Sequence, residues 1–165
     1  MYKILIVEDT LVIREEVFDI LLMEGYTVFQ AENGKIGFEV ALKENPDLII
    51  SDILMPELNG YEMFEKLQGD TKTMSIPLIF LSAKGKKEDI RIGMNLGADD
   101  YLTKPINIKD LINAVENKIK KKIIIDQIII DKTAAVEHIL QNQNNQIKKL
   151  MDEISVIKKL LTNKA

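Results

Sequence analysis

The sequence contains no cysteine and only one histidine, and these two scarcities exclude several kinds of chemistry. None of its 165 residues is Cys, so disulfides, thiol catalysis and thiolate metal sites are excluded. His138 is the single imidazole, so a histidine cluster for a transition metal is excluded as well. Any metal site must therefore use oxygen ligands, which suit Mg²⁺, Ca²⁺ or Mn²⁺.

Long hydrophobic runs and a large excess of either charge are also missing. The apolar N-terminal stretch ends at Val7, where acidic residues follow, and this is neither a signal peptide nor a membrane span. The net charge of −4 argues against a nucleic-acid surface, so we expect no direct DNA binding. The composition, 46% hydrophobic and 29% charged residues, is that of a globular protein, which we expect in the cytoplasm.

The first part of the chain, residues 1–120, alternates short apolar runs with amphipathic stretches, the pattern of an α/β domain. In its first helix the spacing predicts Val12, Val17, Ile20 and Leu21 as the buried face. The predicted strands are 3–7, 27–31, 47–51, 77–82 and 101–102, and the predicted helices are 10–23, 35–44, 60–68, 86–96 and 108 onward. These βα units predict a doubly wound, five-stranded parallel sheet.

The second part, residues 121–165, is predicted to be a helical coiled-coil extension. Phe, Pro and Gly do not occur after Pro105, and from Ile129 the apolar residues follow a heptad with Gln143 as a polar break. The a positions are Leu140, Ile147, Ile154 and Leu161, and the d positions are Ile129, Val136, Leu150 and Ile157. This pattern predicts self-association through residues 129–161, with orientation and stoichiometry left open.

Two features of this second part allow another interpretation of its structure. The isoleucine-rich stretch 120–131 favours a strand by propensity, whereas its position between two helical patterns favours a helix, which we predict. The long helix could also fold back on its own domain, although nothing after residue 130 breaks it for a turn.

Polar side chains gather where the predicted strands end. Parallel strands share one carboxyl edge, so Glu8, Asp9, Asp52, Ser82 and Lys104 are expected to become neighbours there. Three crowded carboxylates repel one another, and a divalent cation, best Mg²⁺, relieves that repulsion. With a hydroxyl and an ammonium beside them, these groups can transfer a phosphoryl group to a carboxylate. The Glu8-Asp9 pair could instead cap the helix that follows.

Residues 1 to about 120 resemble the receiver domain of two-component response regulators. The matching segments, in order and at matching spacing, are Glu8-Asp9, Asp52 in Asp-Ile-Leu-Met-Pro-Glu-Leu-Asn-Gly, Ser82-Ala83, Gly97-Ala98-Asp99-Asp100 and Tyr101-Leu102-Thr103-Lys104-Pro105. The resemblance implies a flavodoxin-like sheet of order 2-1-3-4-5, as in the chemotaxis response regulators.

The resemblance also implies roles for single residues. Asp52 would accept a phosphoryl group from the phosphohistidine of a sensor histidine kinase or a phosphotransfer protein. Glu8, Asp9, Asp52 and the backbone carbonyl of Leu54 would hold Mg²⁺, with Mn²⁺ as the alternative. Ser82 and Lys104 would contact the phosphoryl oxygens, and Ser82 and Tyr101 would form a switch read by an unknown downstream protein.

Three other interpretations compete with this one. A haloacid dehalogenase-like phosphatase uses similar residues, but its nucleophile follows the first strand in an Asp-x-Asp motif, and here that strand ends in Val7-Glu8-Asp9-Thr10. A phosphorylation-dead dimeriser is disfavoured by the intact acid set. The chain could also be a receiver fragment of a larger signalling protein whose output domain is missing. We expect no enzyme in the usual sense, only self-phosphorylation and autodephosphorylation.

Overall fold

The computed structural model describes the backbone of residues 2–83 and 97–162 and the side chains of 2–83 and 97–159. Its elements run in the order β1 (Lys3–Val7), α1 (Leu11–Met23), β2 (Thr27–Ala31), α2 (Gly34–Glu44), β3 (Leu48–Asp52), α3 (Gly60–Gln68), β4 (Leu78–Ala83), β5 (Asp100–Lys104) and α5 (Ile108–Thr162). The helix predicted at 86–96 lies outside the described residues. The chain divides into two units, residues 1–122 and 123–165.

The strands of the first unit form a parallel sheet of order β2-β1-β3-β4-β5, which confirms the predicted topology. The strands β1, β3 and β4 lie inside the sheet and are almost entirely buried, which is why they read as continuous aliphatic runs. The strand β2 lies at an edge and is mostly half-buried. All the strands point the same way, so their carboxyl ends lie along one edge of the sheet.

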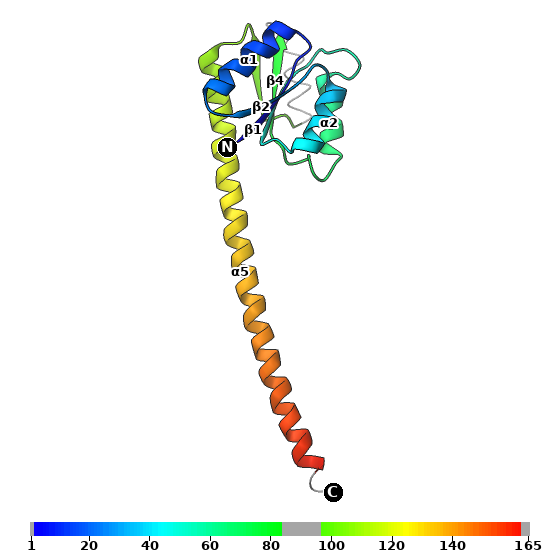
Figure 1. Ribbon diagram of the computed structural model, residues 1–165, viewed down its shortest axis with the longest axis vertical. Coiled ribbons are helices and arrows are strands. Elements are labelled where there is room, and N and C mark those ends of the chain that lie inside the picture. The colour runs from blue at the N-terminus through cyan, green and yellow to red at the C-terminus, as the bar shows by residue number, and fades with distance from the viewer. Residues whose placement is uncertain (1, 84–96, 163–165) are drawn as a thin grey trace. The chain divides into compact units, whose positions relative to one another are not determined.

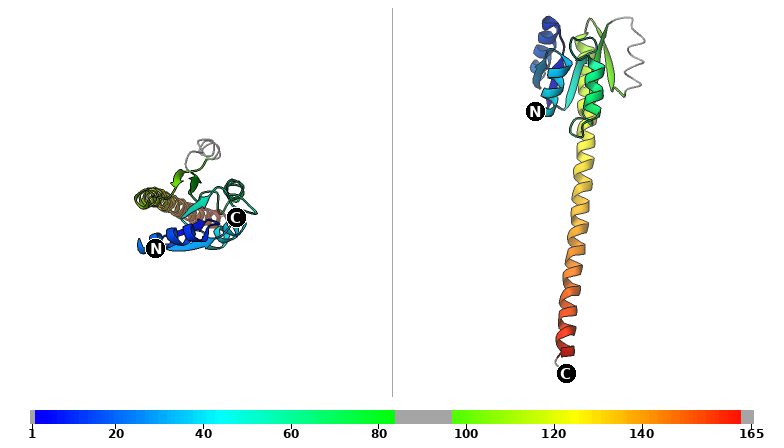
Figure 2. Two further views of the ribbon diagram at one scale, coloured as in Figure 1. Left: turned by 90° about the horizontal axis from the view of Figure 1, so that it is seen from above. Right: turned by 90° about the vertical axis from the view of Figure 1, so that its right-hand side faces the viewer.

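Helices cover both faces of this sheet, as Figures 1 and 2 show. The side chains of β1 alternate between the faces because successive residues of a strand point to opposite sides. Ile4 and Ile6 join the core formed with α1 and the first turns of α5, whereas Leu5 and Val7 join the core formed with α2 and α3. The edge that carries the polar residues is therefore held between two apolar layers.

The helix α1 differs from the prediction at one position of its buried face. Val17 and Leu21 are buried as predicted, but Val12 is 73% exposed and its prediction was wrong. Ile13 packs against the core in its place. The reason is helical geometry: Ile13 lies about one turn before Val17, whereas Val12 is rotated by about 140° from it.

The helix α5 runs from Ile108 to Thr162, and its isoleucine-rich stretch is helical as predicted. Its first turns are fixed to the first unit by two lysines. Lys118 Nζ donates to the carbonyl oxygen of Asp99 at 2.6 Å, and Lys122 Nζ lies 3.4 Å from Asp47 Oδ1.

In the second unit, the side chains of 123–159 are exposed, the apolar heptad positions included. None of the described helices has a stretch apolar enough to span a bilayer.

Candidate phosphoacceptor site

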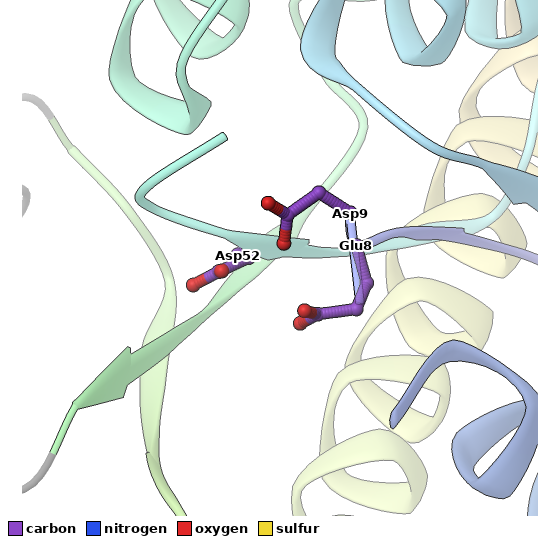
Figure 3. A group of neighbouring side chains, drawn as sticks. All are labelled: Glu8, Asp9 and Asp52. Atoms are coloured by element: carbon purple, nitrogen blue, oxygen red, sulfur yellow. The ribbon is translucent and has the colours of Figure 1, made fainter. Parts of the chain in front are cut away.

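Three carboxylates lie together at the carboxyl edge of the sheet, as predicted. Val7 pairs with Ser51 in the register of β1 and β3, so Glu8 and Asp52 take the next places on adjacent strands. Glu8 is fully buried, Asp52 is 8% exposed and Asp9 is exposed. One carboxylate oxygen from each of the three lies within 4.8 Å of the others, and Figure 3 shows the three side chains.

Lys104, the last residue of β5, reaches the same place. Its Nζ lies 2.7 Å from Glu8 Oε2 and 2.9 Å from Asp52 Oδ2, so one ammonium bridges a carboxylate that follows β1 and a carboxylate at the end of β3. The ammonium offsets one of the three negative charges when all are ionised. A charge of about −2 then remains, which a divalent cation can balance.

Burial and the neighbouring charges shift the pKa values of Glu8 and Lys104. Burial raises the pKa of Glu8, and the nearby Asp52 raises it further, while hydrogen bonding to Lys104 opposes the change only in part. For Lys104, burial lowers the pKa, but hydrogen bonds to Glu8 and Asp52 outweigh that effect and raise the pKa overall. Lys104 therefore remains an ammonium, held by two anions.

The donor set of this cluster fits Mg²⁺. The described residues bring three carboxylates together without a nitrogen or sulfur ligand among them, and Mg²⁺ prefers oxygen ligands from a few carboxylates. Asp9 is the exposed member, so a site built here opens to solvent and leaves room for waters or phosphate oxygens. The predicted carbonyl ligand, Leu54, follows Asp52 by two residues, and its side chain is largely exposed. Its role as a ligand stays a prediction.

The loop after β3 fixes the orientation of Asp52. The backbone N–H of Ile53 donates to Asp52 Oδ1 at 2.7 Å, while Lys104 holds Oδ2. The N–H of Gly60 donates to the carbonyl oxygen of Ile53 at 2.9 Å and closes the loop. Both carboxylate oxygens of Asp52 therefore have partners before a substrate arrives.

Gly60 is a structural requirement of the site, and the sequence predicted no role for it. A Cβ at this position would overlap the carbonyl oxygen of Asp52 and lie 3.1 Å from the Cα of Ile53. Next to it, Asn59 caps α3 through a capping box with Glu62. The signal that could have found Gly60 is the Asn-Gly pair directly before the helix that follows Asp52.

Ser82 and Tyr101 occupy different parts of this region. Ser82 is buried in β4 one residue beyond Leu81, the partner of Asp52 in the sheet, and its hydroxyl donates to the carbonyl oxygen of Ala83 at 3.3 Å. Tyr101 pairs with Phe80 in the register of β4 and β5, and the two ring centroids lie 5.7 Å apart. The switch role of Ser82 and Tyr101 stays a prediction.

Two further findings concern the residues after β1. The alternative that the Glu8-Asp9 pair caps α1 was wrong: Thr10 stands at the N-cap, and its side chain makes no capping hydrogen bond. Glu8 Oε1 instead accepts the N–H of Thr10 at 3.2 Å. Arg14, for which the sequence predicted no role, donates to the carbonyl oxygen of Glu8 at 2.6 Å and so supports the turn that carries the acidic pair.

The Tyr101 hydroxyl leads to a testable pH dependence. It is buried without a hydrogen-bond partner among the described residues, and burial, with a smaller effect of Tyr61, raises the pKa of Tyr101 from 10 to about 12. Between these values the unfolded chain has lost a proton that the folded chain keeps, so stability falls as the pH rises. We expect Tyr101→Phe to remove about 1 kcal/mol of that loss by pH 11, as measured by urea unfolding.

Neutral pH provides the control for this variant. Tyr101 is protonated in both the folded and the unfolded state at pH 8. Its ionisation therefore contributes no difference in the free energy of unfolding between the intact protein and the Phe variant at that pH. The ultraviolet absorbance of phenolate should also lose the component that titrates near pH 12. Parallel loss of stability by the two proteins between pH 8 and 11 would contradict the assignment.

Comparisons with known proteins show the family of the chain. Residues 4–116 match the family "Response regulator receiver domain". Two curated relatives are the probable transcriptional regulator ycf29 of Pyropia yezoensis, 37% identical over 74% of this chain and 55% of that one, and protein PilH of Pseudomonas aeruginosa, 37% identical over 70% and 95%. The chain spans only about half the length, 46–56%, of several curated relatives that it matches.

Among solved structures, the receiver domain of a sensor histidine kinase from Pseudomonas aeruginosa is similar to this chain. The TM-score is 0.68 and the identity 27%, over 72% of this chain and 98% of that one. That structure has a magnesium ion coordinated in its active site cleft.

Proposed function

Because the chain belongs to the response regulator receiver domains of two-component systems, we propose that Asp52 accepts a phosphoryl group. The donor is the phosphohistidine of a sensor histidine kinase or of a phosphotransfer protein. The observation that carries the proposal is the convergence of Glu8, Asp9 and Lys104 on Asp52. The phosphoryl acceptance then changes the receiver surface that partners recognise.

The chain's own residues have defined parts in this transfer. A carboxylate oxygen of Asp52 attacks the phosphorus, the O–P bond forms as the P–N bond breaks, and the histidine leaves with its electron pair and takes up a proton. Lys104 Nζ, 2.9 Å from Asp52 Oδ2, is placed to pair with a phosphoryl oxygen, and Ser82 offers its hydroxyl to another. Mg²⁺, or Mn²⁺, held by Glu8, Asp9, Asp52 and the carbonyl of Leu54 would supply positive charge for those oxygens.

Receiver domains are signalling domains rather than enzymes in the usual sense. We infer that the chemistry of this chain is limited to its own phosphorylation and autodephosphorylation. The order of the elements supports this over a haloacid dehalogenase-like phosphatase, because the acceptor Asp52 ends β3, whereas β1 leads into Glu8-Asp9.

The output has two candidates. In the first candidate, phosphorylation acts through Ser82 and Tyr101, and the output is a change either in protein contacts or in dimerisation of the heptad helix through residues 129–161. The second candidate is a longer architecture, favoured by the observation that this chain spans about half the length of curated transcriptional regulators. The unknown downstream partner, the absence of direct DNA binding and the cytoplasmic location stay predictions.

A small phosphodonor tests the proposed function without a kinase. With acetyl phosphate and Mg²⁺ the intact chain should gain the mass of one phosphoryl group, mapped to Asp52 by borohydride reduction. EDTA should lower the rate of labelling by about 100-fold, because the phosphoryl oxygens then lack their main counter-charge. Restored labelling after excess Mg²⁺ is the control. Labelling that continues unchanged in EDTA, or that maps to another residue, would contradict the proposal.

A further inference from the structure

We propose that the helix of residues 129–159 pairs with the same segment of a second copy of this chain, parallel and in register. This inference rests on the self-association proposed above and adds its orientation and register, with Gln143 facing Gln143. The chemistry that recognises the second copy is an apolar seam flanked by complementary charges.

The seam is an exposed apolar face whose polar interruptions are compatible with burial. Its apolar a and d residues are each 52–57% exposed: Ile129, Val136, Leu140, Ile147, Leu150, Ile154 and Ile157. Thr133 also takes an a position, and its hydroxyl donates to the carbonyl oxygen of Ile129 at 2.8 Å. The hydroxyl is therefore satisfied inside its own helix, and the methyl group can enter the seam. Among the described a and d residues of this segment, Gln143 is then the one whose polar side chain would need a partner inside the seam.

The charges beside the seam are attractive in a parallel arrangement. In parallel coiled coils, a g residue lies next to the e residue that follows five positions later on the partner helix. Lys132 at g then faces Glu137 of the second copy, and Glu153 at g faces Lys158. Each relation occurs twice by symmetry, and every one is attractive. Within residues 129–159, the other g and e residues are uncharged: Ile130, Ile139, Asn144, Gln146 and Met151.

An antiparallel pair fits the same helix poorly. It sets d against a, so the amide of Gln143 would lie against Leu140 or Ile147 and lose its hydrogen-bond partners. It also brings the exposed isoleucine cluster, which comprises Ile123, Ile124, Ile125, Ile128, Ile129 and Ile130, next to the charged residues of the opposite end. In the parallel pair the two isoleucine clusters meet each other, and the two Gln143 amides can bond to each other.

A charge swap in the full-length chain tests the orientation. Glu153→Lys replaces both attractive contacts with Lys158 by repulsive ones, and Lys158→Glu does the same from the other side. Each single variant should raise the dimer dissociation constant about tenfold, equivalent to about 1.4 kcal/mol, in sedimentation experiments at low salt. The double variant should restore it. Asp152→Lys, with the same charge change at an outward f position, is the matched control and should alter the constant less than about twofold.

Cysteine cross-linking gives an independent readout, because the chain has no native Cys. Ile157→Cys should form a homotypic disulfide on oxidation, since identical d residues face each other only in a parallel, in-register pair. A mixture of Ile129→Cys and tagged Ile154→Cys chains should give no mixed product, because only an antiparallel pair brings these positions together.

The outcomes separate this inference from the proposed function. A monomer overturns the self-association as well as its orientation, while phosphorylation of Asp52 is unaffected. If the dimer forms the mixed 129–154 cross-link, the parallel register alone is overturned. The same holds if the double charge swap fails to restore the dimer dissociation constant. Homotypic cross-linking at position 157 with rescue by the double swap supports the inference.

Discussion

We expect Asp52→Asn to abolish labelling of the chain by a small phosphodonor. An amide lacks the anionic oxygen that attacks phosphorus, so the labelling rate should fall at least about 1,000-fold, below detection by intact mass. Lys104, Glu8 and Asp9 remain in the variant, and they bind and orient the phosphoryl group without forming a bond to it. The loss should therefore be complete even at saturating phosphodonor.

The same variant should keep its fold. The Asn Oδ1 can still accept the N–H of Ile53, and Lys104 keeps its contact with Glu8 at 2.7 Å. Removing one of the like charges also lowers the pKa of Glu8, because Asp52 is one of the groups that raise it. The free energy of unfolding should change by less than about 1 kcal/mol, as measured by urea unfolding followed by circular dichroism.

Asp47→Asn is the matched control, since Asp47 lies just before the opposite end of the same strand. Its carboxylate accepts the N–H of Lys3 at 2.8 Å and pairs with Lys122, so its role is structural. We expect this variant to label at the normal rate. Labelling that persists in Asp52→Asn, or disappears in Asp47→Asn, would mean that the acceptor is a different residue.

The sequence predicted this site because the physical rule behind it concerns strand ends. In a parallel sheet the residues that follow the strands share one edge whatever their separation along the chain. Glu8, Asp9, Asp52 and Lys104 follow strands that apolar runs identify, and the structure brings them together. The order of the strands, by contrast, came from the resemblance to receiver domains and was confirmed by the structure.

The sequence could not predict how individual side chains and backbone atoms are placed within each helix, strand or loop. Val12 is as apolar as Ile13, and only the phase of the helix against the sheet decides that Ile13 packs inward. The bridging of Glu8 and Asp52 by one ammonium depends on side-chain reach across strands, which strand order does not reveal. The requirement at Gly60 is a close approach of two backbone segments, which residue type alone does not show.

That close approach makes Gly60→Ala the second variant with a large expected effect. The added methyl group would overlap the carbonyl oxygen of Asp52, which is backbone and cannot move without shifting the end of β3. We expect a loss of about 3 kcal/mol in the free energy of unfolding. Labelling at Asp52 should slow as well, because the displaced backbone carries the acceptor carboxylate away from Lys104 and Glu8.

Gly69→Ala separates this steric effect from the general consequences of replacing glycine. Gly69 caps α3 with ordinary helical angles, and a Cβ there would meet the carbonyl oxygens of Glu65 and Lys66 at 3.5 Å, a normal contact. The control should change stability by less than about 1 kcal/mol, because alanine also restricts the unfolded chain. Equal unfolding midpoints for the two variants would show that the backbone at Asp52 does not approach Gly60 closely. A large difference, with slowed labelling in Gly60→Ala alone, would tie the glycine of the Asp52 loop to the position of the acceptor.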